Sequence, residues 1–501
     1  MSNVRVYPIP DGEPLITDLH LQVNGKTVPL HYARVSAYPI NRRWPGHQRP
    51  LDQTELASFA SFAVDGPVQV QLKPDRPFKE VAVRPISRNI RPQIRDGVIE
   101  FTLPSGGQYT VELDGFHNAL HIFADDFKDF AIGRNDPQVR YFGPGLHDAG
   151  EIELHDNETL FLDEGAIVFG YVVANDARNI RILGHGILDG SKNKEKYLHE
   201  FNDEDRKLLE KGFAVMNVER RATVCLIQCD DLIIDGITIR DSLLYNIRPV
   251  CCNNVQIRNI KLIGNWRYNS DGIDMHNCQD VNISNCFIRT FDDCICIKGF
   301  DRMLTPEMMR RKGGEVRDRN LRITTEKCVL WCDWNTTLEI GAETRAEEIA
   351  YITFRDCDII HNYSAACDIT SVDYAEIHDI LYEDIRVEEN APQPRILQTR
   401  DDQDFTEVPD PPVYGCVLRC VIQRHPEYSG SDMRPSICHD VIYRNISVTG
   451  RMLGCYFLGL DEEHCSGPFR IENLRCNGKH LTDPDDLRLW VDSYIKDFTI
   501  V

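Results

Sequence analysis

The chain has 501 residues, of which 42% are hydrophobic and 27% are charged, and its formal net charge is −22. This balance is that of a globular protein, so a mostly disordered chain is excluded, and the acidic surface disfavours a nucleic-acid partner. At about 100–200 residues per domain, the length allows two to four domains, or one large all-β unit with an appendage.

The N-terminal residues 1–15 contain no basic segment followed by an apolar run, so we expect no secretory signal. No stretch of about 18 uncharged apolar residues follows anywhere in the chain, so no membrane span is expected either. The sequence therefore predicts a cytoplasmic protein without a membrane partner.

Residues 1–140 are predicted to form an N-terminal β-sandwich domain. Short segments there alternate apolar and polar residues, which is typical of half-buried antiparallel strands. Turn signals such as Asp65-Gly66 and Asp96-Gly97 separate them, and several short strands with regular turns favour a sandwich. The clearest predicted strands are residues 68–72, 81–83, 98–101 and 109–113.

Residues 141–501 are predicted to form a right-handed parallel β-helix catalytic domain. The motif apolar-x-x-apolar-x-apolar recurs there around a polar dipeptide, and its first copies are 23 (257−234) and 26 (283−257) residues apart. A period in the twenties with short strands indicates a solenoid. Strands rich in β-branched residues, with Asn or Asp at the bend, favour a β-helix over a leucine-rich repeat. The copies begin at Ile234, Ile257, Ile283, Phe354, Tyr382 and Tyr443.

All eighteen cysteines lie between Cys225 and Cys476, within the predicted β-helix. None has the paired Cys-x-x-Cys spacing of a zinc site, and without a secretory signal reduced thiols are expected in place of disulfides. Stacked coils align equivalent positions, and Cys is small and apolar enough to fill an interior one. We therefore predict buried, reduced cysteines, and we expect neither a metal nor a cofactor.

Two predicted insertions, residues 191–216 and 300–317, interrupt the coils with short helical segments. Insertions on a solenoid gather on one face, which is often the binding face, so we expect these two to rise as walls around a pocket, with plain surface decoration as the alternative. The acidic loop at residues 401–404 has side chains that suit calcium, but a solvated turn is the favoured interpretation.

The densest carboxylate cluster comes from two segments, Asn269–Asp274 and Phe291–Lys298. Asp271 and Asp292 are 21 residues apart (292−271), which is nearly one coil. Residues one coil apart stack at about 4.8 Å, so Asp271 is expected beside Asp292 and Asp293. Crowded carboxylates repel one another, which raises the pKa of at least one and prepares a general acid for glycoside hydrolysis. The alternative is that these aspartates only cap turns at the coil corners.

The segment from Arg221 to Gly299 resembles glycoside hydrolase family 28, the polygalacturonases. It contains Tyr-Asn-Ile-Arg-Pro-Val, Asn-Ser-Asp-Gly and Asp-Asp-Cys-Ile-x-Ile-Lys in that order. The resemblance implies an inverting mechanism in which Asp292 is the general acid, and Asp271 and Asp293 hold and activate water. Inversion implies carboxyl groups about 6.5–9.5 Å apart. The residues that the resemblance assigns to sugar subsites are Asn269 and Lys298.

Two departures from that family bear on the substrate. Thr336 stands where the family has His, and Asp368 and Thr370 stand where it has an Arg-Ile-Lys that grips the substrate carboxylate. Asp368 is expected to repel galacturonate, and no cation is expected to pair the charge of the galacturonate carboxylate. The sequence therefore predicts a neutral sugar. The side chains expected to accept hydrogen bonds from sugar hydroxyls, or to stack on a sugar ring, are Trp334, Thr336, Glu339, Glu343 and Asp368.

The order of a sandwich followed by a β-helix is similar to glycoside hydrolase family 49, the dextranases and isopullulanases, and this implies neutral glucans as substrates. We therefore expect an inverting, exo-acting glycoside hydrolase whose partner is an imported neutral oligosaccharide. A β-helix lyase, epimerase or glycan-rearranging transferase and a non-catalytic carbohydrate-binding protein are the alternatives. A lyase usually needs Arg or Lys as its base, and binding alone does not need clustered carboxylates.

Overall fold

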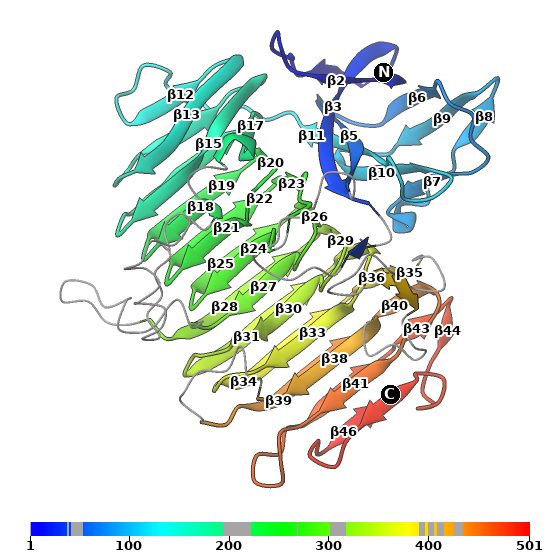
Figure 1. Ribbon diagram of the computed structural model, residues 1–501, viewed down its shortest axis with the longest axis vertical. Helices are drawn as coiled ribbons and strands as arrows, with labels where there is room; N and C mark the ends of the chain where they lie inside the picture. Colours follow the sequence, from blue (N-terminus) through cyan, green and yellow to red (C-terminus); the bar gives the residue numbers. More distant parts are fainter. Residues whose placement is uncertain are drawn as a thin grey trace.

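The computed structural model shows an all-β chain in which an N-terminal sheet packs beside a long solenoid of parallel strands (Figure 1). Among the residues it describes, no helix is long and apolar enough to cross a membrane. The described residues are 2–37, 40–41, 54–193, 222–267, 269–300, 317–389, 396–398, 405–407, 415–424 and 434–501.

In the described part of the chain, the first sheet has ten strands. Alternating side chains of β6 (Val68–Pro74) are buried and exposed, as the sequence predicts. Val83 and Ile99, from opposite ends of the sheet, belong to one hydrophobic core, so the sheet folds over itself as a sandwich. The order is β7 (Val81–Arg84), β10 (Gly107–Leu113), β11 (Leu120–Asp126), β5 (Thr54–Val64), β3 (Lys26–Ser36), β2 (Leu15–Val23), β6, β9 (Val98–Leu103) and β8 (Gln93–Arg95), with β1 (Val4–Val6) on β5.

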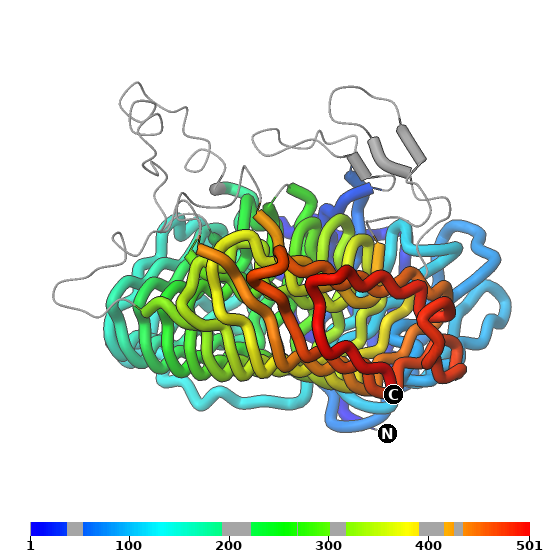
Figure 2. The backbone as a smooth tube through the Cα atoms, turned by 90° about the horizontal axis from the view of Figure 1, so that it is seen from below, coloured from blue at the N-terminus to red at the C-terminus, as the bar shows by residue number. Residues whose placement is uncertain are grey.

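Two long sheets form the solenoid, and Figure 2 shows its coils stacked side by side. Within the described ranges the first has twelve strands, in the order β12 (Val139–Phe142), β14 (Thr159–Leu162), β16 (Arg181–Gly184), β19 (Asp230–Asp235), β22 (Asn253–Arg258), β25 (Gln279–Ser284), β28 (Arg319–Glu326), β31 (Glu348–Arg355), β34 (Glu376–Glu383), β39 (Ile437–Arg444), β42 (Phe469–Glu472) and β46 (Phe498–Ile500).

The second long sheet has 21 strands among the described residues, and its strand pairs are parallel except for β43–β44. Its strands are β13 (Gly145–Leu154), β15 (Ala166–Asn175), β17 (Ile187–Asp189), β18 (Ala222–Ile227), β20 (Thr238–Arg240), β21 (Tyr245–Val250), β23 (Lys261–Ile263), β24 (Ile273–His276), β26 (Phe287–Thr290), β27 (Ile295–Lys298), β29 (Val329–Cys332), β30 (Leu338–Ala342), β32 (Asp358–His361), β33 (Ala365–Ser371), β35 (Arg386–Glu389), β38 (Cys416–Ile422), β40 (Ser447–Gly450), β41 (Cys455–Leu458), β43 (Arg475–Cys476), β44 (Lys479–His480) and β45 (Leu489–Val491).

A smaller sheet links the N-terminal part of the chain to the solenoid, because β4 pairs with β36 in parallel. Its members are β4 (Ile40–Asn41), β36 (Ile396–Gln398) and β37 (Phe405–Glu407). The short 3₁₀ helices of the described chain are η2 (Ile86–Arg88) and η3 (Ser191–Asn193).

The recurring sequence motif marks the corner between the two long sheets. In its first copy, Ile234 lies near the end of β19 and Ile239 lies in β20. The third residue of each copy has a positive φ, which Gly, Asn and Asp tolerate better than other residues. These corner residues are Gly236 (φ 88°), Asn259 (54°), Asn285 (55°), Asp356 (52°), Asp384 (54°) and Asn445 (54°).

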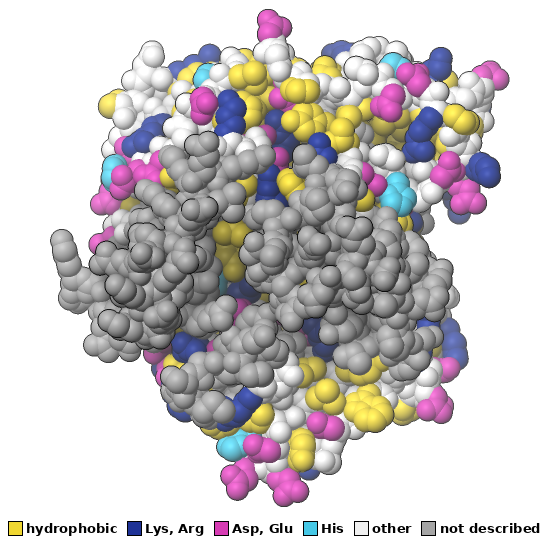
Figure 3. Space-filling model, viewed as in Figure 1, with side chains coloured by type: hydrophobic (Ala, Val, Ile, Leu, Met, Phe, Trp, Pro, Cys, Tyr) yellow, Lys and Arg dark blue, Asp and Glu magenta, His cyan; other side chains and the backbone are white. Residues whose placement is uncertain are grey.

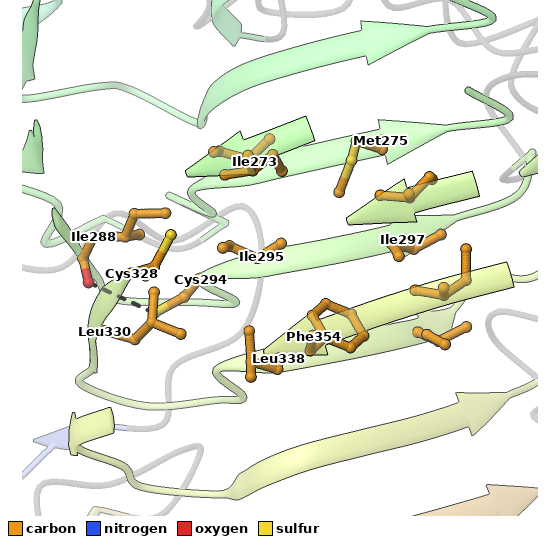
Figure 4. Packing of buried hydrophobic residues seen from close by; sticks show 14 of the residues in the cluster. Ile273, Met275, Ile288, Cys294, Ile295, Ile297, Cys328, Leu330, Leu338 and Phe354 are labelled. Carbon is orange, nitrogen blue, oxygen red and sulfur yellow. Dashed lines mark hydrogen bonds between the residues drawn. The ribbon is translucent and has the colours of Figure 1, made fainter. Parts of the chain in front are cut away.

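The interior of the solenoid is a set of stacked apolar ladders. Ile273, Ile295 and Leu338 occupy matching positions in β24, β27 and β30, and Figure 4 shows them among the buried side chains of neighbouring coils. All eighteen cysteines are free, and all except Cys465 and Cys476 are buried. The predicted fold class is thereby confirmed, and the cysteines do fill interior positions.

The N-terminal sheet is fixed to the solenoid by apolar and ionic contacts. Phe123 of β11 packs against Phe287 of β26, with 5.0 Å between ring centroids. Buried Arg240 of β20 reaches Glu13 at 2.6 Å. On the face shown in Figure 3, acidic and basic side chains are interspersed along the rim of the described part.

Candidate active site

Three consecutive coils bring the predicted catalytic segments to one corner of the solenoid. Asp271 precedes β24, Asp293 precedes β27 and Thr336 precedes β30. The Gly272 amide donates to the Asp293 carbonyl at 2.8 Å, and the Cys294 amide donates to the Thr336 carbonyl at 3.0 Å. The sequence spacing of nearly one coil therefore places Asp271 directly above the Asp-Asp pair.

Gly272 allows this close stacking. A Cβ atom at that position would lie 2.2 Å from the carbonyl oxygen of Cys294 on the next coil. Real Cβ atoms do not approach a backbone oxygen so closely, so any side chain at Gly272 would push the coils apart. The Asp-Gly pair thus combines a functional carboxyl group with the residue that lets the next coil approach it.

The three carboxyl groups are crowded and buried. One oxygen from each of Asp271, Asp292 and Asp293 lies within 4.8 Å of the others, and the exposed fractions are 2%, 5% and 5%. The expected separation of 6.5–9.5 Å is therefore wrong. Two acceptors about 4.5 Å apart can both bind one water that donates hydrogen bonds of about 2.8 Å. The short spacing thus suits carboxylates that share a water.

The crowding changes the acidity of the cluster. Burial, followed by the charge of Asp293, raises the pKa of Asp292 to about 7, while the amide of Asn335 opposes the shift. The Asn335 side chain donates to Asp292 at 2.9 Å. Burial, followed by the charge of Asp274, also raises the pKa of Asp271 well above its usual value. The cluster therefore retains a proton at neutral pH.

Lys298 is a buried cation at this corner. Its ammonium group lies 3.2 Å from an oxygen of Asp271, 3.3 Å from Asp274 and 4.0 Å from Glu343. Burial opposes its charged form, but Asp274 and its acidic neighbours outweigh burial and raise the pKa of Lys298. The ammonium group thus stays charged and stabilises the ionised form of Asp271.

Thr336 and Glu339 join the cluster from the third coil. The Thr336 hydroxyl lies 2.7 Å from Asp293 Oδ1 and 2.5 Å from Glu339 Oε2. The Thr336 amide also donates to Asp293 at 3.2 Å. Glu339 Oε2 is therefore in contact with a protein hydroxyl, in place of the sugar hydroxyl that the sequence suggested.

The interpretation of Asp368 must also be corrected. Asp368 is fully buried, and Arg419 donates to both of its oxygens at 2.7 Å. The carboxylate therefore has a cation that pairs its charge, and it is not an acceptor for sugar hydroxyls. The spacing of the sequence repeats does not indicate this pairing, because the two residues are 51 positions apart.

The remaining predicted subsite residues lie around the same corner. Trp334 is half-buried and stacks on Phe291, with ring centroids 5.1 Å apart. Asn269 and Glu343 are also half-buried. Sequence reasoning missed Asp274 and Asn335 as functional residues. Asp274 could have been found, because it lies in the same acidic segment as Asp271.

The oxygen atoms of Asp271, Asp292 and Asp293 are near enough together to hold a hard cation such as calcium or magnesium. The ammonium group of Lys298 already supplies positive charge beside this group. The predicted calcium loop at 401–404 and nearly all of the insertions 191–216 and 300–317 lie outside the described residues.

The chain is similar to several known proteins. A probable polygalacturonase from Vitis vinifera is 34% identical over 73 residues, which cover 14% of this chain and 15% of that protein. The solved structure of Dex49A from Penicillium minioluteum matches 100% of this chain and 96% of its own, with a TM-score of 0.68 at 15% identity. The Yersinia enterocolitica family 28 exopolygalacturonase structure covers the same shares, with a TM-score of 0.48 at 14% identity.

The fold is therefore shared with Dex49A over both parts of the chain. The sequence match to the Vitis protein spans only a small part of that protein's length. The model of glycosyl hydrolases family 28 matches residues 151–407, which is just over half of the chain and includes the whole carboxylate corner. The chain belongs to glycosyl hydrolases family 28.

Proposed function

We propose that the protein is an inverting glycoside hydrolase that removes sugar units from the ends of neutral oligosaccharides in the cytoplasm. The observation that carries this proposal is the buried corner where Asp271, Asp292 and Asp293 lie within 4.8 Å of one another. A carboxylic acid and a carboxylate on either side of one glycosidic bond are the groups that its hydrolysis requires.

In the proposed reaction Asp292 protonates the leaving oxygen. Its pKa of about 7 keeps a large fraction of the group protonated at neutral pH, as a general acid requires. Asp271 and Asp293 hold the attacking water. The Lys298 ammonium group contacts Asp271 and opposes the rise in the pKa of Asp271, and Thr336 donates two hydrogen bonds to Asp293. Water adds to the anomeric carbon as the bond to the leaving oxygen breaks, and one of the two carboxyl groups that hold the water accepts its proton, so one displacement inverts the anomeric centre.

Charge near the cluster supports a neutral substrate. Lys298 is held by Asp271 and Asp274, and Arg419 is bound at both oxygens of Asp368. These two cations are thus neutralised by the protein itself. A uronate would bring another negative charge to a corner already rich in carboxylates, which costs binding free energy.

Other features support the cell compartment and the exo mode. All eighteen cysteines are free, which suits a reducing compartment. The two insertions that precede and follow the carboxylate segments in sequence supply the length needed for walls around a pocket.

The test is a substrate panel of neutral disaccharides, aryl glycosides and longer oligosaccharides, each with a uronide of matched linkage. We expect a neutral glycoside to be cleaved from one end, so that a single monosaccharide or disaccharide accumulates first. The uronide is expected to react at least tenfold more slowly in kcat/KM. A faster reaction with the uronide contradicts the neutral-substrate proposal. A ladder of internal cleavage products contradicts the exo proposal, and eliminated, unsaturated products indicate a lyase.

A further inference from the structure

The Thr336 hydroxyl is in close contact with two carboxyl groups at once. Its oxygen lies 2.7 Å from Asp293 Oδ1 and 2.5 Å from Glu339 Oε2, and all three residues are buried. A Thr hydroxyl has one proton to donate and lone pairs that accept. If both carboxyl groups were ionised, one of the two short contacts would place lone pairs against lone pairs.

One of the two carboxyl groups must therefore carry a proton and donate it to Thr336. Asp293 is the better acceptor, because it receives the Thr336 amide at 3.2 Å as well as the hydroxyl. Hydrogen bonds from backbone amides favour the charged form of a carboxylate. Asp293 is thus the acceptor of both hydrogen bonds from Thr336.

Glu339 is the better acid. It lies in β30, where its neighbour on the next coil is Asp368, and it is 3% exposed. Burial, followed by the charges of Asp293 and Asp368, raises the pKa of Glu339 well above its usual value, against the effect of Lys298. Arg419, another cation near Glu339, is bound to Asp368.

We propose that Glu339 is a neutral carboxylic acid whose O–H donates a hydrogen bond to the Thr336 oxygen. The Thr336 hydroxyl then donates its own hydrogen bond to Asp293, and this contact orients Asp293 as the carboxylate that holds the attacking water. This inference rests on the proposed function and deepens it. Glu339 is a positioning residue, since it contacts Thr336 and acts on the water only through Thr336 and Asp293.

The chain of hydrogen bonds has a direction, and the protonation of Glu339 sets it. If Glu339 were ionised, it would accept the hydrogen bond from the Thr336 hydroxyl. Asp293 would then lose its hydroxyl donor. Other groups that face Glu339 are Cys296, whose sulfur lies within 4.8 Å of a Glu339 oxygen, and Asp368. Activity should therefore fall at alkaline pH when Glu339 ionises, in addition to any loss from Asp292.

The decisive comparison is Glu339→Gln against Glu339→Ala in the full-length enzyme. Gln keeps an N–H donor toward Thr336, while Ala has none. We expect Glu339→Ala to lower kcat by about tenfold to a hundredfold, as loss of a supporting hydrogen bond does, with KM little changed. The kcat of Glu339→Gln should be at least tenfold higher than that of Glu339→Ala. Activity of Glu339→Gln should also lack the part of the decrease at alkaline pH that the ionisation of Glu339 causes. The control is Glu376→Ala, at a side chain that is 63% exposed on the outer face.

Thr336→Val tests the relay itself. Without the hydroxyl, Gln and Ala at position 339 should differ by less than about threefold in kcat, because the coupling between the two positions is gone. Equal loss in Glu339→Gln and Glu339→Ala, with Thr336 present, overturns the inference. A rise in KM in both variants at unchanged kcat also overturns it, since that result means Glu339 binds the sugar as an ionised acceptor.

Infrared spectroscopy separates this inference from the proposed function, because it needs no substrate. The difference spectrum between wild type and Glu339→Gln at neutral pH should show that the variant lacks the carbonyl band of one protonated carboxyl group. Loss of carboxylate bands instead overturns the inference, even if the enzyme hydrolyses glycosides as proposed. If no glycoside is cleaved but the protonated band is lost, the proposed function fails and Glu339 is still a neutral acid.

Discussion

Asp292 is the residue on which the chemistry depends. Its carboxyl group is buried beside Asp293 and held by Asn335, and its pKa of about 7 is the result of burial first and of the Asp293 charge second. A general acid must be protonated when the substrate binds and weak enough to accept the proton back. The environment supplies both properties at neutral pH.

Substitution of Asp292 by Asn should therefore abolish most turnover without unfolding the protein. The amide keeps the shape and can still contact Asn335, but it has no proton to give, so kcat should fall by about 10²–10⁴-fold. The control is Asp280→Asn, which makes the same change at an exposed aspartate that pairs with Arg322. Activity of Asp292→Asn within a few-fold of wild type contradicts the assignment of the acid.

The raised pKa of Asp292 also makes a prediction for stability. The proton is bound more tightly in the folded state than in the unfolded state, where the pKa is near 3.8, so stability falls as pH rises from about 4 through about 7. Asn removes the charge that must be buried at high pH. Asp292→Asn should therefore be more stable than wild type at pH 8, by about 1–2 kcal/mol, and the gain should vanish at pH 4. Urea unfolding at the two pH values checks this, and an equal difference at both contradicts the buried-charge account.

The coil is the element that made both the fold and the site predictable. The corners of the coils could be predicted from Gly, Asn and Asp residues, which tolerate positive φ. The stacking of Asp271 beside Asp292 could be predicted from their sequence spacing of nearly one coil. Prediction failed where the period is interrupted. Arg419 reaches Asp368 from 51 residues away, and no repeat spacing indicates such a partner. The distance between carboxyl oxygens depends on side-chain rotamers, which a coil period does not determine.

Gly272 tests how closely the coils must stack. A Cβ atom at this position would lie 2.2 Å from the Cys294 carbonyl, so Gly272→Ala should cost about 1–3 kcal/mol in unfolding free energy and should displace Asp271. The matched control is Gly133→Ala, where the nearest atom to the new Cβ is 3.6 Å away. Chemical denaturation of both variants checks this. Similar stability in the two variants contradicts the close approach of the coils.

The cysteine ladders give a second test at the level of the coils. Sixteen buried thiols should be protected in the folded protein, and only the half-buried Cys465 and Cys476 should react readily. Titration with a thiol reagent should therefore find few groups in the native state and all eighteen after unfolding. An unfolded protein that shows fewer than eighteen thiols without added reductant contradicts the reduced state.

At the scale of the whole molecule, the solenoid positions the candidate site and the N-terminal sandwich packs against its flank. The apolar contact between Phe123 and Phe287, and the ion pair between Arg240 and Glu13, join the two parts next to the coils that carry the site. The order of sandwich and solenoid was predictable from the change in sequence periodicity. The docking of one on the other was not, because it depends on side chains far apart in the chain.

The central claim is a single displacement by water, and the configuration of the first product tests it most directly. The carboxyl groups are closer together than the usual spacing of inverting enzymes, so the stereochemical result is decisive. Proton NMR of a cleaved neutral glycoside, recorded before mutarotation, should show the inverted anomer, with the oxygen of labelled water in the new hydroxyl group. A first-formed product with the retained configuration would contradict the account, because it requires a covalent intermediate on one of the three aspartates.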